Sequence, residues 1–324
     1  MHKDSVISID MGGTKVLGCV VNSKEGIIAS VKKPTDPTVS RKKYIHQLAE
    51  IVFELIEEVH INQKKIKAVC LGVPGLLNPY TGVIGLAPNL GLKIFNIKKS
   101  LEDEIPFPVL IENDVNLGAI GIKNFGVGKK AKNMLAVFVG TGIGGGLIID
   151  GKMYRGSNYV AGEIGHMLVE KNGPKCGCGR KGCFEAIASR TAIVNKIIKD
   201  IKSGKRSTLS NLVKSGERIR SRSLLNAVKK KDKVVCKRIK EGCEVIGGVL
   251  ASISNLLNLD MIVLGGGMIE ALDFYMLPII KKSFSEHVLN DSAKGFKIVA
   301  SKLADDAAIF GGIALAEEFL GVKV

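Results

Sequence analysis

A strand, a Gly-Thr turn and a second strand occur twice in this chain, and this repetition restricts the fold more than any other feature of the sequence. The first copy spans Val6–Asn22, with its turn at Met11–Thr14. The second copy spans Leu135–Ile149, with its turn at Gly140–Gly146. Two similar units this far apart predict a duplicated architecture and not a short-period solenoid.

Other apolar segments place helices between strands. Apolar residues at helical spacing predict helices, and compact apolar runs that end in glycine or polar turns predict buried strands. The elements predicted outside the two copies are helices at 44–60, 241–258 and 307–320, and strands at 68–73, 109–111 and 261–264. Because strands alternate with helices, the predicted fold class is α/β.

The length of 324 residues favours two domains, at about 150 residues per domain. No proline-rich or low-complexity linker separates two halves of the chain, and a hinge near 114–118 is the expected boundary. The sequence therefore predicts an N-terminal domain made of 1–114 and 308–324 and a C-terminal domain made of 115–307.

Composition excludes several classes of protein. With 46% hydrophobic and 24% charged residues, the chain is unlike collagen, a disordered tail or a small disulfide scaffold. Neither a signal peptide nor a transmembrane segment is visible in the sequence, so we expect a cytoplasmic protein that does not associate with membranes.

Positive charge is concentrated in one segment. The formal net charge is +16, and residues 196–240 hold 16 Lys and Arg against three acidic residues. Such a segment can be a solvated helical face or a nucleic-acid patch. The segment has no aromatic residue on which bases could stack, so no specific nucleic-acid partner is expected.

The two Gly-Thr turns predict binding of nucleotide phosphates. Glycine lets the main chain approach an anion, and successive N–H groups in such a bend bind it. Lys15 adds a positive charge, and Asp10 is placed where its carboxylate would face a phosphate-bound cation. Neither turn is a Walker loop, and neither is a Rossmann turn because a strand follows each one. The alternative is a pair of ordinary hairpin turns, which a third glycine cluster at Gly265–Gly267 makes less favoured.

One His/Cys cluster has the spacing of a metal site. His166, Cys176, Cys178 and Cys183 form the pattern H-x9-C-x-C-x4-C, and glycines between them allow a tight loop. Four ligands of these types suit tetrahedral zinc, and with all four positions filled the zinc would be structural. Two alternatives are that the four residues are unrelated or that two of the cysteines form a disulfide. The histidine and the glycines argue against a disulfide, because neither has a role in one.

Three carboxylates are candidates to bind a substrate hydroxyl or to accept its proton. Asp114 follows a buried strand and could accept a proton from an alcohol, although Asn113-Asp114 alone is more often a cap or a turn. Glu163 precedes His166 by three residues, and Glu185 directly follows the cysteine loop. If a metal held His166 through one ring nitrogen, the other nitrogen could bind a ligand hydroxyl.

These motifs together resemble the sugar kinases of the ROK family. The segments that carry the resemblance are Asp10–Lys15, Glu112–Asp114, Gly140–Gly146, Gly162–His166 and Cys176–Glu185. The resemblance covers essentially the whole chain; Met11 and Phe184 depart conservatively from the family pattern. It implies an α/β fold of two actin-like (ribonuclease H-like) ATPase domains with a cleft between them.

The resemblance also implies the role of each matching residue. Asp114 would be the catalytic base, and zinc would bind His166, Cys176, Cys178 and Cys183. The residues that would bind sugar hydroxyls are Asn89, Asn113, Asp114, Glu163, His166 and Glu185. The residues that would bind ATP, with Mg²⁺ at the phosphates and the last three at the adenosine end, are Asp10, Gly12, Gly13, Thr14, Lys15, Gly140, Thr141, Gly142, Gly144, Gly145, Gly265, Gly266 and Gly267.

The implied activity is an ATP-dependent hexose kinase that converts glucose to glucose 6-phosphate, and a homodimer is the expected assembly. N-acetylmannosamine, N-acetylglucosamine and fructose kinases share the same motifs and stay open. A sugar sensor without catalytic activity is the alternative from another class. Some ROK members are repressors with an N-terminal DNA-binding domain, which we do not expect here because only nine residues precede Asp10.

Overall fold

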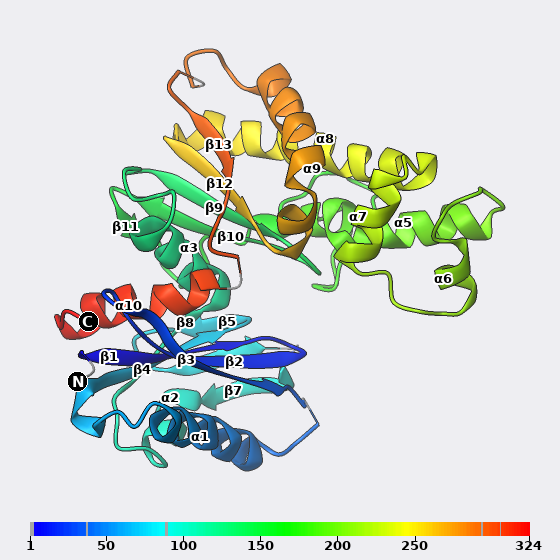
Figure 1. Cartoon of the computed structure of the whole chain (residues 1–324). Coiled ribbons are helices and arrows are strands. Elements are labelled where there is room, and N and C mark those ends of the chain that lie inside the picture. The colour runs from blue at the N-terminus through cyan, green and yellow to red at the C-terminus, as the bar shows by residue number, and fades with distance from the viewer. Residues whose placement is uncertain (1–2, 37, 88–89, 293, 305) are drawn as a thin grey trace. The chain divides into compact units, whose positions relative to one another are not determined.

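The structure is a computed structural model that describes residues 3–36, 38–87, 90–292, 294–304 and 306–324 (Figure 1). The strands are β1 (Ser5–Met11), β2 (Lys15–Asn22), β3 (Gly26–Pro34), β4 (Ile66–Val73), β5 (Leu76–Asn78), β6 (Val83–Ala87), β7 (Leu92–Asn96), β8 (Val109–Asn113), β9 (Met134–Val139), β10 (Ile143–Ile149), β11 (Lys152–Met153), β12 (Met261–Gly265) and β13 (Lys297–Ala300). The α-helices are α1 (Arg41–Glu58), α2 (Ile97–Glu102), α3 (Asp114–Phe125), α4 (Phe184–Ala188), α5 (Arg190–Lys202), α6 (Ser210–Lys214), α7 (Ser221–Lys229), α8 (Lys233–Leu257), α9 (Gly267–His287) and α10 (Asp306–Leu320).

Two five-stranded sheets repeat one topology. The first has the order β3-β2-β1-β4-β8 and the second β11-β10-β9-β12-β13. In the first sheet β1 pairs antiparallel with β2 and parallel with β4, and in the second β9 pairs parallel with β12. The duplicated α/β architecture predicted from the two Gly-Thr turns is therefore confirmed. A small sheet of the order β5-β6-β7, which the sequence analysis did not predict, accompanies the first.

The described residues form two compact units. The first contains residues 1–132, 146–162 and 305–324, and the second contains 133–145 and 163–304. This division gives α3 to the first unit, whereas the boundary predicted at Asp114 gives it to the second domain. The physical reason is close packing of α3 on α10: a Cβ added to Gly121 would lie 1.8 Å from the carbonyl oxygen of Ala307.

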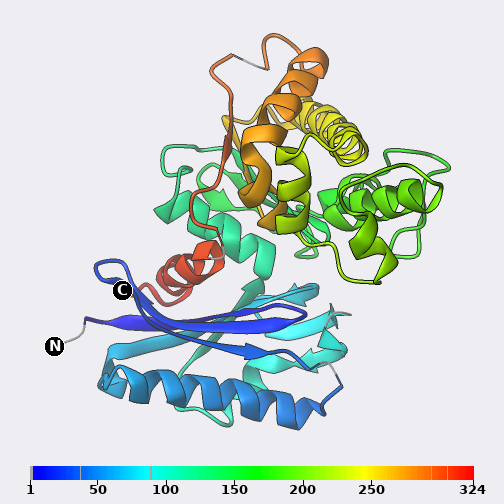
Figure 2. The same ribbon diagram turned by 45° about the vertical axis from the view of Figure 1, so that its right-hand side comes forward.

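In the first unit, α1 and α2 cover one face of the sheet, and α3 and α10 cover the other (Figures 1 and 2). Alternation along β1 produces these two faces, because successive side chains of a strand point to opposite sides. Ile7 and Ile9 belong to the apolar core with α1, and Val6 belongs to the core with α10. Ser8 also lies on the α10 side, where its hydroxyl donates to the carbonyl oxygen of Ala308 at 3.4 Å.

In the second unit, α9 contacts β9, β12 and β13 and packs along α8. Helix α8 begins at Lys233, eight residues before the predicted start. Asp232 caps it, because its carboxylate accepts hydrogen bonds from the N–H groups of Val234 and Val235 at 3.0 and 3.1 Å. The helix therefore starts within the basic segment, where lysines obscured the apolar pattern.

The second Gly-Thr turn is shorter than predicted. Strand β10 begins at Ile143, so Gly144, Gly145 and Gly146 lie in the strand and only 140–142 form the turn. Glycine has a weak strand propensity, so the sequence pattern placed the start of this strand at Leu147.

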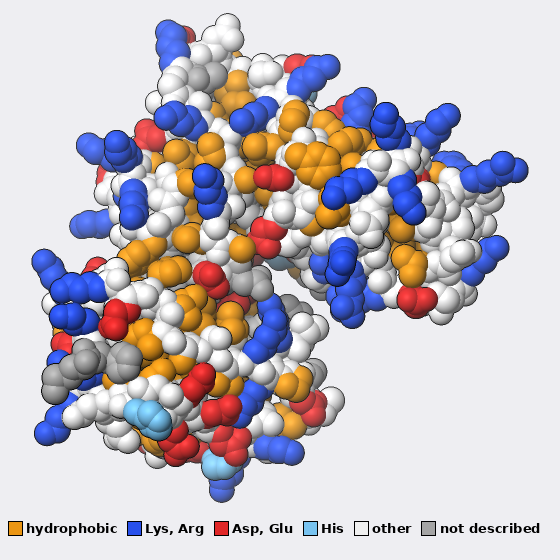
Figure 3. Space-filling view, viewed as in Figure 1, with side chains coloured by type: hydrophobic (Ala, Val, Ile, Leu, Met, Phe, Trp, Pro, Cys, Tyr) orange, Lys and Arg blue, Asp and Glu red, His pale blue; other side chains and the backbone are white. Residues whose placement is uncertain are grey.

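The basic segment forms the end of α5, all of α6 and α7, and the start of α8. Most of its Lys and Arg side chains are exposed, and Figure 3 shows them as blue side chains over the region of α5 to α7. Among the described helices, none is long and apolar enough to cross a membrane.

Candidate functional site

The first Gly-Thr turn connects β1 and β2 in the first unit. The N–H of Gly12 donates to the carbonyl oxygen of Lys15 at 2.9 Å, and the hydroxyl of Thr35 donates to the carbonyl oxygen of Gly12 at 2.6 Å. Gly13 and Thr14, at the tip of the turn, are exposed. The turn is thus fixed at its base and open to a ligand at its tip.

Asp10 and Asp114 lie beside each other at one edge of the first sheet. Strand β4 runs between β1 and β8, and Gly72 of β4 is the register partner of Asp10. A Cβ added to Gly72 would lie 3.6 Å from Oδ1 of Asp10 and 3.6 Å from the Cα of Asp114. The carboxyl ends of parallel strands meet at this edge, which is where α/β folds place their ligands.

Asn113 and Asp114 form the start of α3. The side-chain oxygen of Asn113 accepts hydrogen bonds from the N–H groups of Val115 and Asn116, and its Nδ2 donates to the carbonyl oxygen of Gly75 at 3.2 Å. Oδ1 of Asp114 accepts from the N–H of Val115 at 3.0 Å. Asn113 is therefore the N-cap of the helix, and Asp114 is a half-buried carboxylate in its first turn.

A buried charged network contacts the start of α3. It was not predicted from the sequence. Glu112, only 1% exposed, accepts hydrogen bonds from Nε of Arg155 at 2.7 Å and from the N–H of Asn113 at 2.9 Å. The guanidinium of Arg155 also binds both carboxylate oxygens of Glu318 in α10. The two carboxylates raise the pKa of Arg155 against the effect of burial. The one signal in the sequence was a glutamate at the end of an apolar strand.

The second Gly-Thr turn lies in the second unit and is held by the start of α5. The N–H of Arg190 donates to the carbonyl oxygen of Gly140 at 3.0 Å, and Nη2 of Arg190 donates to the hydroxyl of Thr141 at 2.8 Å. The hydroxyl of Thr191 donates to the carbonyl oxygen of Thr141 at 2.7 Å. No motif in the sequence marked Arg190 or Thr191.

The structure brings His166, Cys176, Cys178 and Cys183 together in the second unit, with their ligand atoms all within 4.8 Å of one another. The Sγ atoms of Cys178 and Cys183 lie 3.7 Å apart, as do Sγ of Cys176 and Nδ1 of His166. Two sulfurs bound tetrahedrally to zinc at about 2.3 Å lie about 3.8 Å apart. The donor set therefore fits four-coordinate zinc, whereas a disulfide needs sulfurs about 2.05 Å apart.

Backbone hydrogen bonds hold the cysteine loop beside His166. Leu168 and Cys183 form an antiparallel bridge, and the N–H of Phe184 donates to the carbonyl oxygen of Met167 at 2.9 Å. Gly182 has a φ of +75°, and a Cβ there would lie 1.7 Å from the carbonyl oxygen of Glu170. Only glycine fits this position, because both the φ and the close contact exclude a side chain.

The acidic residues near the cluster contact it directly. Nε2 of His166 lies 3.8 Å from Oε2 of Glu163, on the side of the ring opposite the nitrogen that faces Cys176. Partial burial raises the pKa of Glu163, and the nearby charge of Glu185 raises it further while His166 lowers it. A carboxylate oxygen of Glu185 accepts from the N–H of Ile143 at 3.0 Å. Glu185 thus connects the cysteine loop to the second Gly-Thr turn.

Asn89 lies outside the described residues. In the third glycine cluster, Gly265 ends β12, Gly266 has a φ of +85°, and Gly267 begins α9. The cluster is therefore a strand-to-helix turn in the second unit.

Known proteins resemble this chain along almost its whole length. The model of the ROK family matches residues 6–319. A glucokinase of Halalkalibacterium halodurans is 30% identical over 307 residues, which cover 94% of this chain and 93% of the relative. The xylose repressor of Caldicellulosiruptor bescii is 28% identical, over 97% of this chain and 79% of the repressor.

Among solved structures, a ROK family glucokinase from Streptomyces griseus in complex with glucose and AMPPNP has a TM-score of 0.83 and 27% identity. The match covers 97% of this chain and 99% of that protein. This glucokinase and the chain therefore share one fold along nearly their whole length.

Proposed function

The chain belongs to the ROK family, and we propose that it is an ATP-dependent hexose kinase that phosphorylates glucose at its 6-hydroxyl. The observation that carries the proposal is the pair of carboxylates, Asp10 and Asp114, on either side of Gly72 at the carboxyl edge of the first sheet. This arrangement puts a candidate base and a candidate cation ligand next to one another, beside the first Gly-Thr turn.

Asp114 is the proposed catalytic base. Its carboxylate would take the proton from the sugar hydroxyl while the hydroxyl oxygen bonds to the γ-phosphorus and the bond to the leaving ADP breaks. Asn113 fixes the main chain at this point, because its side chain caps α3. Glu163, His166 and Glu185 would bind other hydroxyls of the sugar, together with Asn113 and Asn89.

The two Gly-Thr turns would bind the phosphates through their N–H groups, and Lys15 would add a positive charge. Mg²⁺, when bound, would neutralise phosphate charge and orient the γ-phosphoryl group. The carboxylate of Asp10 is an oxygen ligand of the kind that Mg²⁺ prefers, so Asp10 fits this role. The strand-to-helix turn Gly265–Gly267 would lie at the adenosine end.

Zinc would be held by the four cluster residues and would be structural, because they fill its tetrahedral positions. The spacing of their ligand atoms supports this proposal. Nδ1 of His166 lies 3.7 Å from Sγ of Cys176, so zinc bound there would leave Nε2 on the side of Glu163, available to a sugar hydroxyl. The fixed loop would in turn hold Glu185 against the N–H of Ile143.

A sugar sensor without kinase activity is the second candidate. The similarity to a xylose repressor favours it, because that relative shows that the scaffold also occurs in a repressor. The relatives named glucokinase match along nearly their whole length, which favours the kinase. Other hexoses, including N-acetylmannosamine, N-acetylglucosamine and fructose, remain candidate substrates. A cytoplasmic location and a homodimer stay predictions, the latter open to measurement by sedimentation.

The deciding experiment is an assay of ADP release with ATP, Mg²⁺ and a panel of hexoses and N-acetylhexosamines. We expect turnover with glucose. We also expect Asp114→Asn to lower kcat by about 10²- to 10⁴-fold, the usual contribution of a general base, with little change in the affinity for ATP.

Asp103→Asn is the matched control, because Asp103 is an exposed aspartate at the end of α2 in the same unit. It should leave kcat unchanged. Full turnover by Asp114→Asn would remove Asp114 from the mechanism. Sugar binding without ADP release for every sugar would favour the sensor.

A further inference from the structure

Arg190, the first residue of α5, connects three segments of the second unit. Its Nη2 donates to the hydroxyl of Thr141 at 2.8 Å, and its Nη1 donates to the hydroxyl of Ser221, the first residue of α7, at 3.3 Å. Its N–H donates to the carbonyl oxygen of Gly140. The guanidinium is therefore fixed at the second Gly-Thr turn by two neutral hydroxyls.

The positive charge of Arg190 has no counter-charge within the part of the chain that the structure describes. No carboxylate there forms an ion pair with it, although the side chain is half-buried. Burial lowers the pKa of Arg190, and the nearby charge of Arg218 lowers it further. Partial removal of an uncompensated charge from water is unfavourable. An anion at this point would supply the missing partner.

The surroundings of Arg190 favour an anion. Arg218, Arg220 and Arg222 are exposed and flank Ser221 in the sequence, and α5 presents its N-terminus to the turn. The N-terminus of a helix carries partial positive charge. In the region of α5 to α7, Figure 3 shows several separate blue side chains on the visible surface.

We propose that Arg190 is a ligand of the phosphates of the nucleotide, held ready at the second Gly-Thr turn by Thr141 and Ser221. This inference rests on the proposed function, since it adds a residue to the phosphate site of that kinase. The guanidinium has five N–H donors in a planar fork, so donors remain for phosphate oxygens beyond the two hydroxyl contacts. Arg218, Arg220 and Arg222 of the basic segment would then help to attract the donor nucleotide.

The test compares Arg190→Gln with the wild-type enzyme in the presence of Mg²⁺. Glutamine removes the charge and keeps an amide N–H donor on a shorter side chain. We expect the KM for ATP and the inhibition constant of ADP to rise about tenfold to a hundredfold, the usual effect of losing a charged hydrogen bond. The KM for the sugar and the inhibition constant of adenosine, which has no phosphate, should not change.

Lys199→Gln is the control, because it removes an exposed positive charge from the other end of the same helix. An unchanged KM for ATP in Arg190→Gln would overturn the inference, as would an equal loss of adenosine binding, which would indicate a purely structural role. Arg190→Lys should recover part of the ADP affinity. If the wild-type chain released no ADP with any sugar, binding of ADP against adenosine, measured by calorimetry, would still test Arg190.

Discussion

Glu112 receives three hydrogen bonds in the interior of the first unit, from the N–H of Asn113, from Nδ2 of Asn116 and from Nε of Arg155. Two of these donors belong to the start of α3, where Asp114 lies. A carboxylate that is almost fully buried needs such partners, because desolvation of an unpaired charge is very unfavourable. At the scale of single residues, Glu112 and Arg155 are therefore positioning residues for the proposed base.

We predict that Arg155→Met destabilises the first unit by about 3–5 kcal/mol, the usual result when one partner of a buried ion pair is removed. Arg155 is 8% exposed and Glu112 is 1% exposed, so the remaining carboxylate could not reach water. Denaturant unfolding would measure the loss. Lys152→Met, an exposed site in β11, is the control.

The double variant Glu112→Gln with Arg155→Met separates pairing from packing. It should be more stable than Arg155→Met alone, because it no longer buries an unpaired charge. A double variant as unstable as the sum of the two single changes would contradict a direct interaction.

At the scale of elements, the cysteine loop is held by the backbone bridge Leu168–Cys183 and by the contact between Glu185 and Ile143. These contacts position the loop, but three thiols within a few ångströms of one another need a cation to be stable as thiolates. The loop, the start of α4 and the second Gly-Thr turn then form one connected patch. Loss of the ion would affect every residue in it.

We predict that Cys178→Ala loses bound zinc and weakens binding of the sugar, because His166 and Glu185 would no longer be held in place. Metal analysis of the purified protein and a titration with glucose would measure both effects. Cys236→Ala, at a half-buried cysteine of α8, should keep its zinc. Full metal content together with unchanged sugar affinity in Cys178→Ala would exclude this role for the loop.

Helices α5 and α8 are joined by a second charged contact. Asp200 of α5 accepts hydrogen bonds from Nε and Nη2 of Arg238 at 2.7 and 2.8 Å and from Nζ of Lys205 at 2.7 Å. These donors hold the pKa of Asp200 well below its ordinary value of 3.8. Because the folded protein binds this proton less strongly than the unfolded chain does, the contact stabilises the fold above pH 3.8 and its contribution falls as the pH drops below that value.

We predict that Asp200→Asn lowers stability by about 2 kcal/mol at pH 7, the scale of lost hydrogen bonds to charged groups. The difference from the wild type should shrink as the pH falls from 4 toward 2, because the unfolded wild-type chain then binds a proton at Asp200 that the folded protein binds only at lower pH. Thermal unfolding at several pH values would measure this, with Asp103→Asn as the control. A difference that stays constant down to pH 2 would contradict the assignment.

At the scale of the whole molecule, the chain contains one topology twice, and the two copies carry different chemistry. The first unit contains Asp10 and Asp114, and the second contains the His/Cys cluster and the turn held by Arg190.

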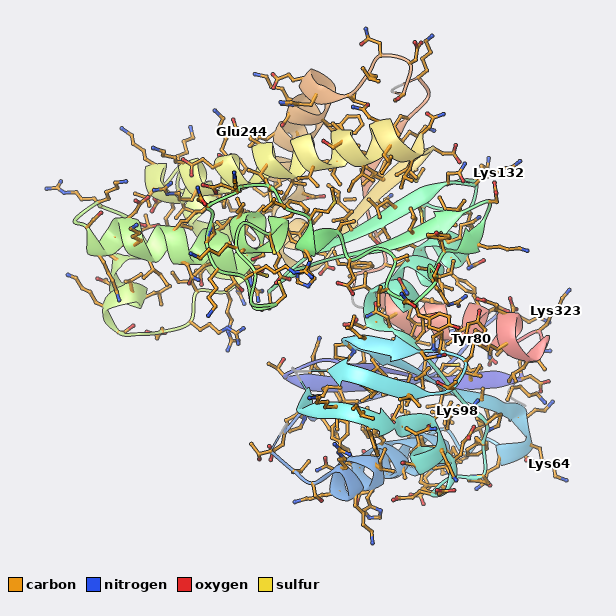
Figure 4. All side chains as sticks on the ribbon, turned by 180° about the vertical axis from the view of Figure 1, so that it is seen from behind. Lys64, Tyr80, Lys98, Lys132, Glu244 and Lys323 are labelled. Carbon is orange, nitrogen blue, oxygen red and sulfur yellow. The ribbon has the colours of Figure 1, made fainter. Side chains whose placement is uncertain are left out.

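Figure 4 shows Tyr80 beside α10, where its ring lies 5.5 Å from that of Phe319. The small sheet between β4 and α2 is thus tied to the C-terminal helix within the first unit.

The sequence alone was enough to predict the duplicated α/β fold, the two Gly-Thr turns and the gathering of His166 with the three cysteines. These features depend on short-range patterns: strand alternation, glycine at turns and ligand spacing. It also placed Asp114 at a strand end. The sheet β5-β6-β7 was not predicted, because its strands are short. The start of α8 at Lys233 was not predicted, because lysines interrupt the apolar pattern there.

Only the tertiary structure could decide which distant residues meet. Arg155 joins Glu112, which lies 43 positions before it, to Glu318, which lies 163 positions after it, and Arg190 reaches Thr141 across 49 positions. Packing of α3 on α10 likewise decided the division into units. The physical reason is that such contacts depend on where folded elements bring side chains together, and no local pattern of residues records the position of a partner far along the chain.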